Sequence, residues 1–261
     1  MVRNVRFVGS LVLVGSLIVA TGTARADGPC GGLSLQAAND ALRSALKAAQ
    51  AQSNGGFGLN MWATLVNREG LVCAVAFTGT GWGDQWPGSR VISAQKANTA
   101  NAFSLPGLAI STANLYTATQ PGGNLFGLQE SNPVNTSVAY GGNAGDYGTA
   151  KDPMIGGRIG GVNVFGGGLA LYDSSRQLVG GVGVSGDSSC ADHNIAWRTR
   201  RNLNLDFVPA GVSGDPSRKD NIVYDITPQA GQMPGTSAGG WGHASCGAAA
   251  ATIAASLVPN Q

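Results

Sequence analysis

The chain has 261 residues, of which 11% are charged, and its formal net charge is +2. Three of its 16 basic residues lie in an N-terminal leader described below, so 13 basic residues face 14 acidic ones in the rest of the chain. A duplex-binding protein needs a basic surface that displaces counterions. The charge balance therefore excludes nucleic acid as an expected partner, and we interpret the arginine cluster near position 200 as a solvated helix face.

Residues 1–26 have the layout of a secretory signal peptide. Two arginines give a positive start, residues 7–20 are largely apolar, and Ala-Arg-Ala at residues 24–26 is a small-x-small cleavage site. The apolar stretch is shorter than the ~20 residues that span a bilayer, and glycine and serine interrupt it. We therefore expect a secreted or periplasmic protein that begins at Asp27 and has no membrane span.

The following segments predict a helix, a hairpin and a second helix. After Ser34, a helix N-cap, small and apolar residues recur every three or four positions up to Ala49 and form one stripe, which would lie across a sheet. Residues 61–66 and 71–77 are strand-like runs joined by Asn-Arg-Glu-Gly, a turn with glycine where a positive φ is needed. Residues 89–103 are rich in alanine and predict a helix whose small side chains allow close packing.

Two stretches interrupt this pattern. A Gly/Asn-rich surface insertion is expected at residues 120–160, after a short helix near residues 108–118, because long loops without secondary structure of their own tend to be functional or mobile. Residues 209–261 form a C-terminal extension that reads as loop up to residue 242 and then as an alanine-rich helix. The core domain is expected at residues 27–208.

Between these stretches lies the segment that specifies local structure best. Residues 169–172 and 177–184 are strand-length apolar runs, and the Asp-Ser-Ser-Arg between them favours a tight turn. Glycines at residues 183–186 make a corner, and Ser188 then caps a helix that continues through Trp197. Helices segregated from strands that are joined by tight turns predict an α+β domain with an antiparallel sheet.

Four cysteines in an exported chain indicate disulfides. Four cysteines allow three pairings, and the sequence does not choose among them. Cys190 and Cys246 both lie in polar, glycine-rich surroundings, so we favour that pair, which would staple the C-terminal tail to the start of the last helix of the core domain. Cys73 lies in an apolar strand, where we expect a small buried thiol. The spacing of the four does not resemble a zinc site.

Three short motifs are weighed against simpler interpretations. Residues 181–186 match the dinucleotide-binding pattern G-x-G-x-x-G, but that pattern requires a parallel βαβ unit, so we interpret the glycines as a tight strand-to-helix corner. Residues 235–239 match G-x-S-x-G, but no buried strand precedes them. Residues 93–96 match S-x-x-K without the other elements of a serine acyltransferase.

His193 and His243 are the only histidines of the chain. His193 lies in the first turn of a helix beside the glycine corner, where it either faces a pocket or packs locally. His243 is interpreted as a residue of the tail. Tyrosine can also hold haem iron, and Tyr116, Tyr140 and Tyr147 lie in or near the insertion.

Three separated segments, in the right order, resemble the GlcG/HbpS-like family, which includes the C-terminal domain of PduO. These are A-T-L-V-N-R-E-G-L-V at residues 63–72, A-Q-K-A-N-T-A-N-A-F at residues 94–103, and the closing G-G-V-G-V-S-G at residues 180–186 with Asp192. The match covers about residues 33–203 and is interrupted by the insertion. It is more specific than any of the short motifs.

The resemblance implies a profilin-like α+β fold with an antiparallel sheet of about five strands, usually assembled into oligomers. Some members bind haem, and exported ones resemble extracellular haem binders. Lys96, Thr99 and Phe103 are the positions of this chain that match the family's helix motif. His193 follows Asp192 where relatives often carry an acidic residue, which raises the prospect of an axial haem ligand here.

The leading hypothesis is a secreted haem-binding protein that sequesters or senses haem and is more a binder than an enzyme. The predicted haem-binding residues are His193, as the iron ligand, with Lys96, Thr99, Phe103 and Asp192. Trp197 would also cover the porphyrin, and Lys96 or Arg198 would meet its propionates. We further expect a homo-oligomer. The alternatives are an enzyme acting on a small hydroxy- or oxo-acid near residues 183–187, or a ligand-free structural envelope protein.

Overall fold

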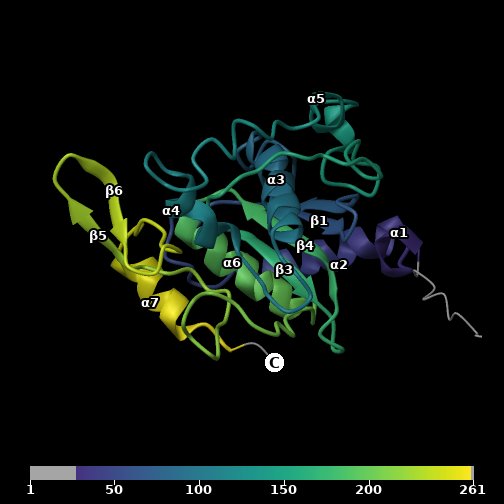
Figure 1. Ribbon diagram of the computed structural model, residues 1–261. Helices are drawn as coiled ribbons and strands as arrows, with labels where there is room; N and C mark the ends of the chain where they lie inside the picture. Colours follow the sequence, from purple (N-terminus) through teal and green to yellow (C-terminus); the bar gives the residue numbers. More distant parts are fainter. Residues whose placement is uncertain (1–27, 260–261) are drawn as a thin grey trace, which may run out of the picture.

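A four-stranded sheet forms the centre of the computed structural model, which describes residues 28–259 (Figure 1). Its strands are β1 (Trp62–Asn67), β2 (Val72–Phe77), β3 (Gly168–Tyr172) and β4 (Leu178–Ser185), in the order β2-β1-β4-β3. All three neighbouring pairs are antiparallel. The predicted α+β class and antiparallel sheet are confirmed, with four strands in this sheet instead of about five. The predicted signal peptide lies outside the described residues.

Three helices cover the two faces of this sheet. On one face lies α3 (Ser89–Ala102), and on the other lie α2 (Leu35–Gln50) and α6 (Ser189–Asn202). The predicted N-caps are confirmed: the Ser34 hydroxyl accepts the Ala37 N–H at 3.2 Å, and the Ser188 hydroxyl accepts the Ala191 N–H at 3.4 Å. The core is thus divided into one apolar layer under α3 and another under α2 and α6.

The glycines of β4 serve the packing of α3. A Cβ atom built on Gly181 or Gly183 would clash with backbone oxygens of α3, and one on Gly168 of β3 would do the same. Gly183 pairs with Gly168 across the sheet, so the two glycines lie side by side under the helix. The first two glycines of the G-x-G-x-x-G pattern therefore allow α3 to pack closely on the sheet. Both neighbours of β4 are antiparallel to it, which excludes the parallel βαβ unit that a dinucleotide site needs.

The Gly/Asn-rich insertion packs on the core more closely than a surface loop would. It contains α5 (Thr136–Ala139) and the 3-10 turn η2 (Ala144–Asp146), and its Met154 and Ile159 are fully buried beside α3. Asp152 of the insertion forms a buried, bidentate ion pair with Arg90 of α3. Before the insertion, η1 (Thr112–Leu115) and α4 (Tyr116–Thr119) replace the single short helix expected there.

The C-terminal extension lies along α6. Its terminal helix α7 (Ala248–Ser256) is confirmed, but the preceding stretch, expected as loop, contains a hairpin of β5 (Ile226–Gln229) and β6 (Gln232–Ser237) that projects from one side of the molecule (Figure 1). Asp220 of the extension forms a bidentate ion pair with Arg200 of α6, and both side chains are fully buried. The extension thus supplies a carboxylate to the core, as the insertion does.

Two disulfides link distant parts of the chain. Cys190–Cys246 joins the first turn of α6 to the extension, which confirms the favoured pair. Cys30–Cys73 joins α1 (Gly28–Gly31) to β2, so the expectation of a free thiol at Cys73 is wrong. The apolar surroundings of Cys73 indicated its burial correctly, but its partner is 43 residues away in a segment that the local pattern does not link to β2. Within residues 28–259, no helix combines the length and apolar character needed to cross a membrane.

Candidate functional site

A cavity of about 290 Å³ opens where β4 ends and α6 begins, under the N-terminal half of α3. Its apolar rim includes Trp86 and Phe165, whose side chains are 54% and 47% exposed. Exposed aromatic residues beside a cavity are a typical feature of a binding surface. The complete lining is Trp86, Ser89, Ile92, Lys96, Phe165, Ser185, Asp187, Ser189 and Asp192.

A buried ion pair forms the floor of this cavity. The Lys96 ammonium lies 2.7 Å from an Asp192 carboxylate oxygen and donates to the Val184 carbonyl at 3.1 Å. The other Asp192 oxygen accepts the Asp187 N–H at 2.9 Å. Burial raises the pKa of Asp192 to about 6, although the Lys96 charge opposes the shift. The predicted residues Lys96 and Asp192 are therefore brought together at one site.

Asp187 orders the backbone beside the cavity. Its carboxylate accepts the N–H groups of Phe57, Leu59 and Ser188 at 2.6–3.2 Å. Gly56 is required here because a Cβ atom at that position would overlap the carboxylate. Asp187 also lines a neighbouring pocket of about 400 Å³ beneath the loop of residues 53–59. The cavity and this second pocket thus meet at the glycine corner, and Asp187 lines both.

Thr99 and Phe103 do not line this cavity. The Thr99 hydroxyl donates to the Gln95 carbonyl at 2.8 Å and accepts the Asn163 N–H at 2.9 Å. It therefore links the segment that precedes β3 to α3. Phe103 packs in a small apolar cluster with Leu115 and Val164. These two motif positions have structural contacts in this chain, and their predicted role in haem binding stays a prediction.

His193 is fully buried under the C-terminal extension. Its Nε2 atom lies 3.1 Å from both the Asn221 Oδ1 atom and the Ile222 N–H nitrogen, and burial lowers the pKa of its imidazole to about 3. The ring is not part of the cavity wall. Its role as the haem-iron ligand stays a prediction, and this packing does not favour it, because the extension would have to move to free Nε2. Trp197, which was expected to cover the porphyrin, is also buried in the core.

The contacts of His243 could not be expected from the local sequence. Its Nε2 atom lies 2.7 Å from the Ser189 hydroxyl oxygen, and its Nδ1 atom lies 2.6 Å from the Ala244 carbonyl oxygen. The Tyr116 ring packs against the imidazole in a tilted arrangement, with 4.6 Å between the ring centroids. Burial lowers the pKa of His243 to about 4. Because Ser189 is partly exposed and lines the cavity, His243 is separated from the cavity by one hydroxyl group.

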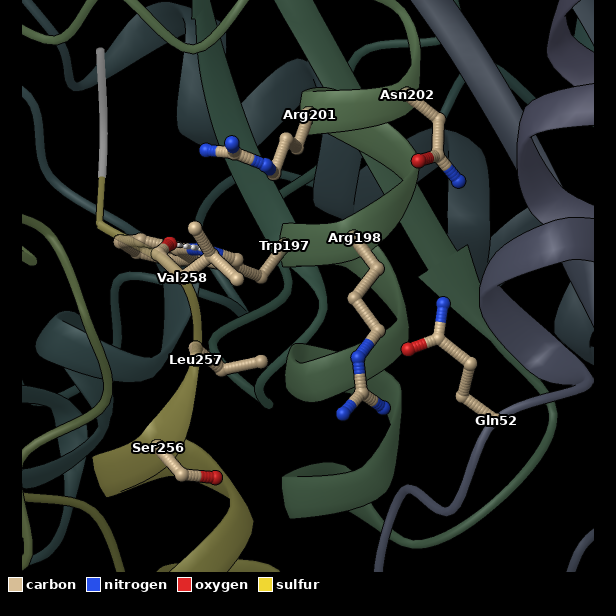
Figure 2. Close-up of a pocket in the computed structure, with 8 residues that line it drawn as sticks. All are labelled: Gln52, Trp197, Arg198, Arg201, Asn202, Ser256, Leu257 and Val258. Carbon is tan, nitrogen blue, oxygen red and sulfur yellow. Dashed lines mark hydrogen bonds between the residues drawn. The ribbon is translucent and has the colours of Figure 1, made fainter.

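The remaining candidates lie elsewhere. Arg198 lines a separate pocket of about 200 Å³, and Figure 2 shows its side chain and that of Arg201 pointing in different directions from α6. Arg198 donates to the Ser53 carbonyl at 2.7 Å, and Arg201 donates to the Pro259 carbonyl at 2.8 Å. The Tyr147 ring lies under the Arg90 guanidinium, and Tyr140 is exposed on the insertion. In the described part of the chain, no group of three or more His, Cys, Asp or Glu side chains is arranged to hold a metal ion.

These features define an α+β domain with an antiparallel sheet and a cavity between α3, the end of β4 and the start of α6. The chain belongs to the HbpS-like family, described as haem degrading protein HbpS-like, whose model matches residues 33–200. The matched region contains Lys96, Asp192 and Ser189 but ends before His243.

Solved structures of the same kind are similar to this chain at low identity. The Klebsiella pneumoniae protein ORFY, of the DUF336 family, is 22% identical over 66% of this chain and 90% of its own, with a TM-score of 0.44. The PduOC:heme complex is 21% identical over 66% of this chain and 97% of its own, with a TM-score of 0.44. HbpS is 19% identical over 65% and 88%, with a TM-score of 0.40. No curated protein matches the sequence significantly.

Proposed function

We propose that this protein binds haem, outside the cytoplasm, in the cavity between α3 and the start of α6. The observation that carries the proposal is the combination of an exposed aromatic rim, Trp86 and Phe165, with a buried ammonium group at the floor. A porphyrin is an apolar disc with carboxylates at one edge. A cavity with an apolar rim and a cationic floor matches both parts of such a ligand.

Lys96 is the residue best suited to meet a propionate. An ammonium group has three donors, and two of them are directed to Asp192 and Val184. Among the described residues the third donor has no acceptor, so it would serve one that enters the cavity. Because Asp192 already neutralises most of this charge, the pair would orient a carboxylate more than it would attract one from a distance.

The cavity fits part of a porphyrin. Its 290 Å³ lies just below the ~300–1,000 Å³ that is typical of small-molecule sites, so the ring would extend past the rim. Bound haem would supply redox chemistry at its iron. The residues of this chain would bind and orient the ring. A homo-oligomer, which we still expect, would cover the part of the ring that extends beyond one chain.

Haem titration of the chain without its predicted signal peptide tests the proposal. We expect a saturable Soret band, and Trp86→Ala or Phe165→Ala should weaken binding by about 10-fold or more, because each removes an aromatic contact worth ~1.5–3 kcal/mol when buried. Phe126→Ala is the matched control, since Phe126 is an exposed phenylalanine of the insertion that does not line the cavity.

Two outcomes would overturn the proposal: the absence of a saturable band, or equal weakening in all three variants. In the first case the alternatives return, an enzyme acting on a small hydroxy- or oxo-acid near Asp187 or a ligand-free envelope protein. Binding of an oxo-acid in place of haem, measured by calorimetry, would separate these two.

A further inference from the structure

The C-terminal extension brings an imidazole to a serine that faces the cavity. Ser189 is the first residue of α6, and His243 lies 54 positions later in the chain. We propose that Ser189 and His243 form a nucleophile and general-base pair that hydrolyses small carboxylic esters. This activity is separate from haem binding and needs no cofactor.

The hydrogen bonds of His243 leave its Nε2 atom as the acceptor. Its Nδ1 atom lies 2.6 Å from the Ala244 carbonyl oxygen, which accepts hydrogen bonds only, so Nδ1 carries the proton. The lone pair of Nε2 then faces the Ser189 hydroxyl at 2.7 Å, within the range for proton transfer between a nucleophile and its base. Burial keeps the ring neutral at ordinary pH, because it lowers the pKa of His243 to about 4.

The surroundings of Ser189 favour negative charge on its oxygen. The Gly166 N–H donates to the hydroxyl oxygen at 2.7 Å, and the residue lies at the N-terminus of a 14-residue helix, where backbone dipoles favour an anion. The Lys96 ammonium lines the same cavity. The Gly166 N–H and the helix N-terminus stabilise the serine oxygen as it loses its proton, and Lys96 offers a positive charge in the cavity for the carbonyl oxygen of the ester, where negative charge develops in the tetrahedral intermediate.

The reaction follows from these positions. The Ser189 oxygen attacks the ester carbonyl carbon while its proton passes to Nε2 of His243. The tetrahedral intermediate collapses, the bond to the alkoxide breaks, and the leaving alcohol takes the proton from Nε2. Water then attacks the acyl-serine with His243 again as the base, which releases the carboxylic acid and restores the serine. Water is the only co-reactant.

The cavity indicates the class of substrate. Trp86, Ile92 and Phe165 offer an apolar surface to an acyl group, and the volume of 290 Å³ limits that group to a small one. Short, uncharged acyl esters therefore fit better than peptides or long lipids.

The test uses the haem-free chain without its predicted signal peptide. We expect a fluorophosphonate probe to label Ser189, located by mass spectrometry of the modified peptide, and the protein to hydrolyse p-nitrophenyl acetate or butyrate. Ser189→Ala and His243→Gln should each lower the hydrolysis rate by about 100-fold or more. Ser175→Ala, at an exposed serine in the turn before β4, is the matched control and should leave the rate unchanged.

Thermal melting and a thiol assay check that each variant folds with both disulfides closed. If His243→Gln does not fold, Ser189→Ala alone decides, since it removes a single oxygen atom. The proposal is overturned if the probe does not label Ser189, or if hydrolysis continues at the same rate in folded Ser189→Ala. Because no haem is present, neither result bears on haem binding.

Discussion

Acidification should destabilise this protein through its two buried histidines. Burial lowers the pKa of His193 to about 3 and that of His243 to about 4. In the unfolded chain each imidazole takes up a proton near pH 6.5. Below that pH the unfolded state binds more protons than the folded state, so stability is complete above pH 6.5 and is lost as the pH falls.

The magnitude follows from the width of this window. Between pH 6.5 and pH 5, each histidine lowers the free energy of unfolding by about 2 kcal/mol. Asp192 acts in the opposite sense, because burial raises its pKa to about 6 and the folded state therefore takes up this proton before the unfolded state does. Over the same pH range this raises the free energy of unfolding by about 1 kcal/mol. Burial also raises the pKa of Asp206, so this carboxyl adds to the stabilisation at low pH. The net loss at pH 5 is therefore expected to be about 3 kcal/mol or slightly less.

The charged groups near the two rings do not change the sign. Asp220 favours the protonated form of His193, whereas Arg200 and His243 disfavour it, and desolvation is larger than all three. Lys96 disfavours protonation of His243, and the hydrogen bond to the Ala244 carbonyl favours it. In both cases burial decides the direction of the pKa shift.

Urea unfolding followed by circular dichroism at pH 7 and pH 5 measures this loss. The double variant His193→Gln and His243→Gln keeps hydrogen-bonding side chains but cannot titrate, so its stability should no longer fall between these two pH values. The reasoning is refuted if the wild-type protein is equally stable at both pH values, or if the double variant loses as much stability as the wild type.

Three further predictions concern the packing of the core. Replacing Cys190 and Cys246 with alanine should lower the free energy of unfolding by about 2–4 kcal/mol, because the disulfide closes a loop of more than 50 residues, and urea unfolding of the folded variant would show it. Gly183→Ala should cost about 3 kcal/mol, since its Cβ atom would push α3 from the sheet; an unchanged melting temperature would contradict this. Lys96→Met should cost about 3–5 kcal/mol by leaving Asp192 buried and unpaired, and the added replacement Asp192→Leu should recover most of that loss in the same melting assay.

The sequence predicts the local structure of the core well. The apolar stripe after Ser34, the tight turns of both hairpins and the Ser188 cap are decided by neighbouring residues, and each is confirmed. The alanine-rich helix at residues 89–103 and the glycines of β4 were predicted separately. The structure shows that the two features belong together, because the glycines make room for the backbone of this helix.

Partners that are distant in the sequence could not be predicted. The disulfide of Cys73 with Cys30 and the contact of His243 with Ser189 join segments that no local pattern connects. His193 lies in the predicted helix, one residue past its first turn, and the residues that cover it, 221–222, come from a stretch expected to be loop. Among the predicted site residues, Lys96 of α3 and Asp192 of α6 are brought together in one cavity at the end of β4, although their helices cover opposite faces of the sheet.

The two buried arginine–aspartate pairs define how much of the chain must be kept for it to fold. Arg90 and Arg200 lie inside the region that matches the family, but their partners Asp152 and Asp220 come from the insertion and the extension. A shortened version that ends at residue 200, or that replaces the insertion with a short linker, would leave a guanidinium in the interior without its counter-ion. The part of the chain that must fold together is therefore longer than the region that matches the family. Expression of residues 33–200 alone should give an unstable, aggregating product.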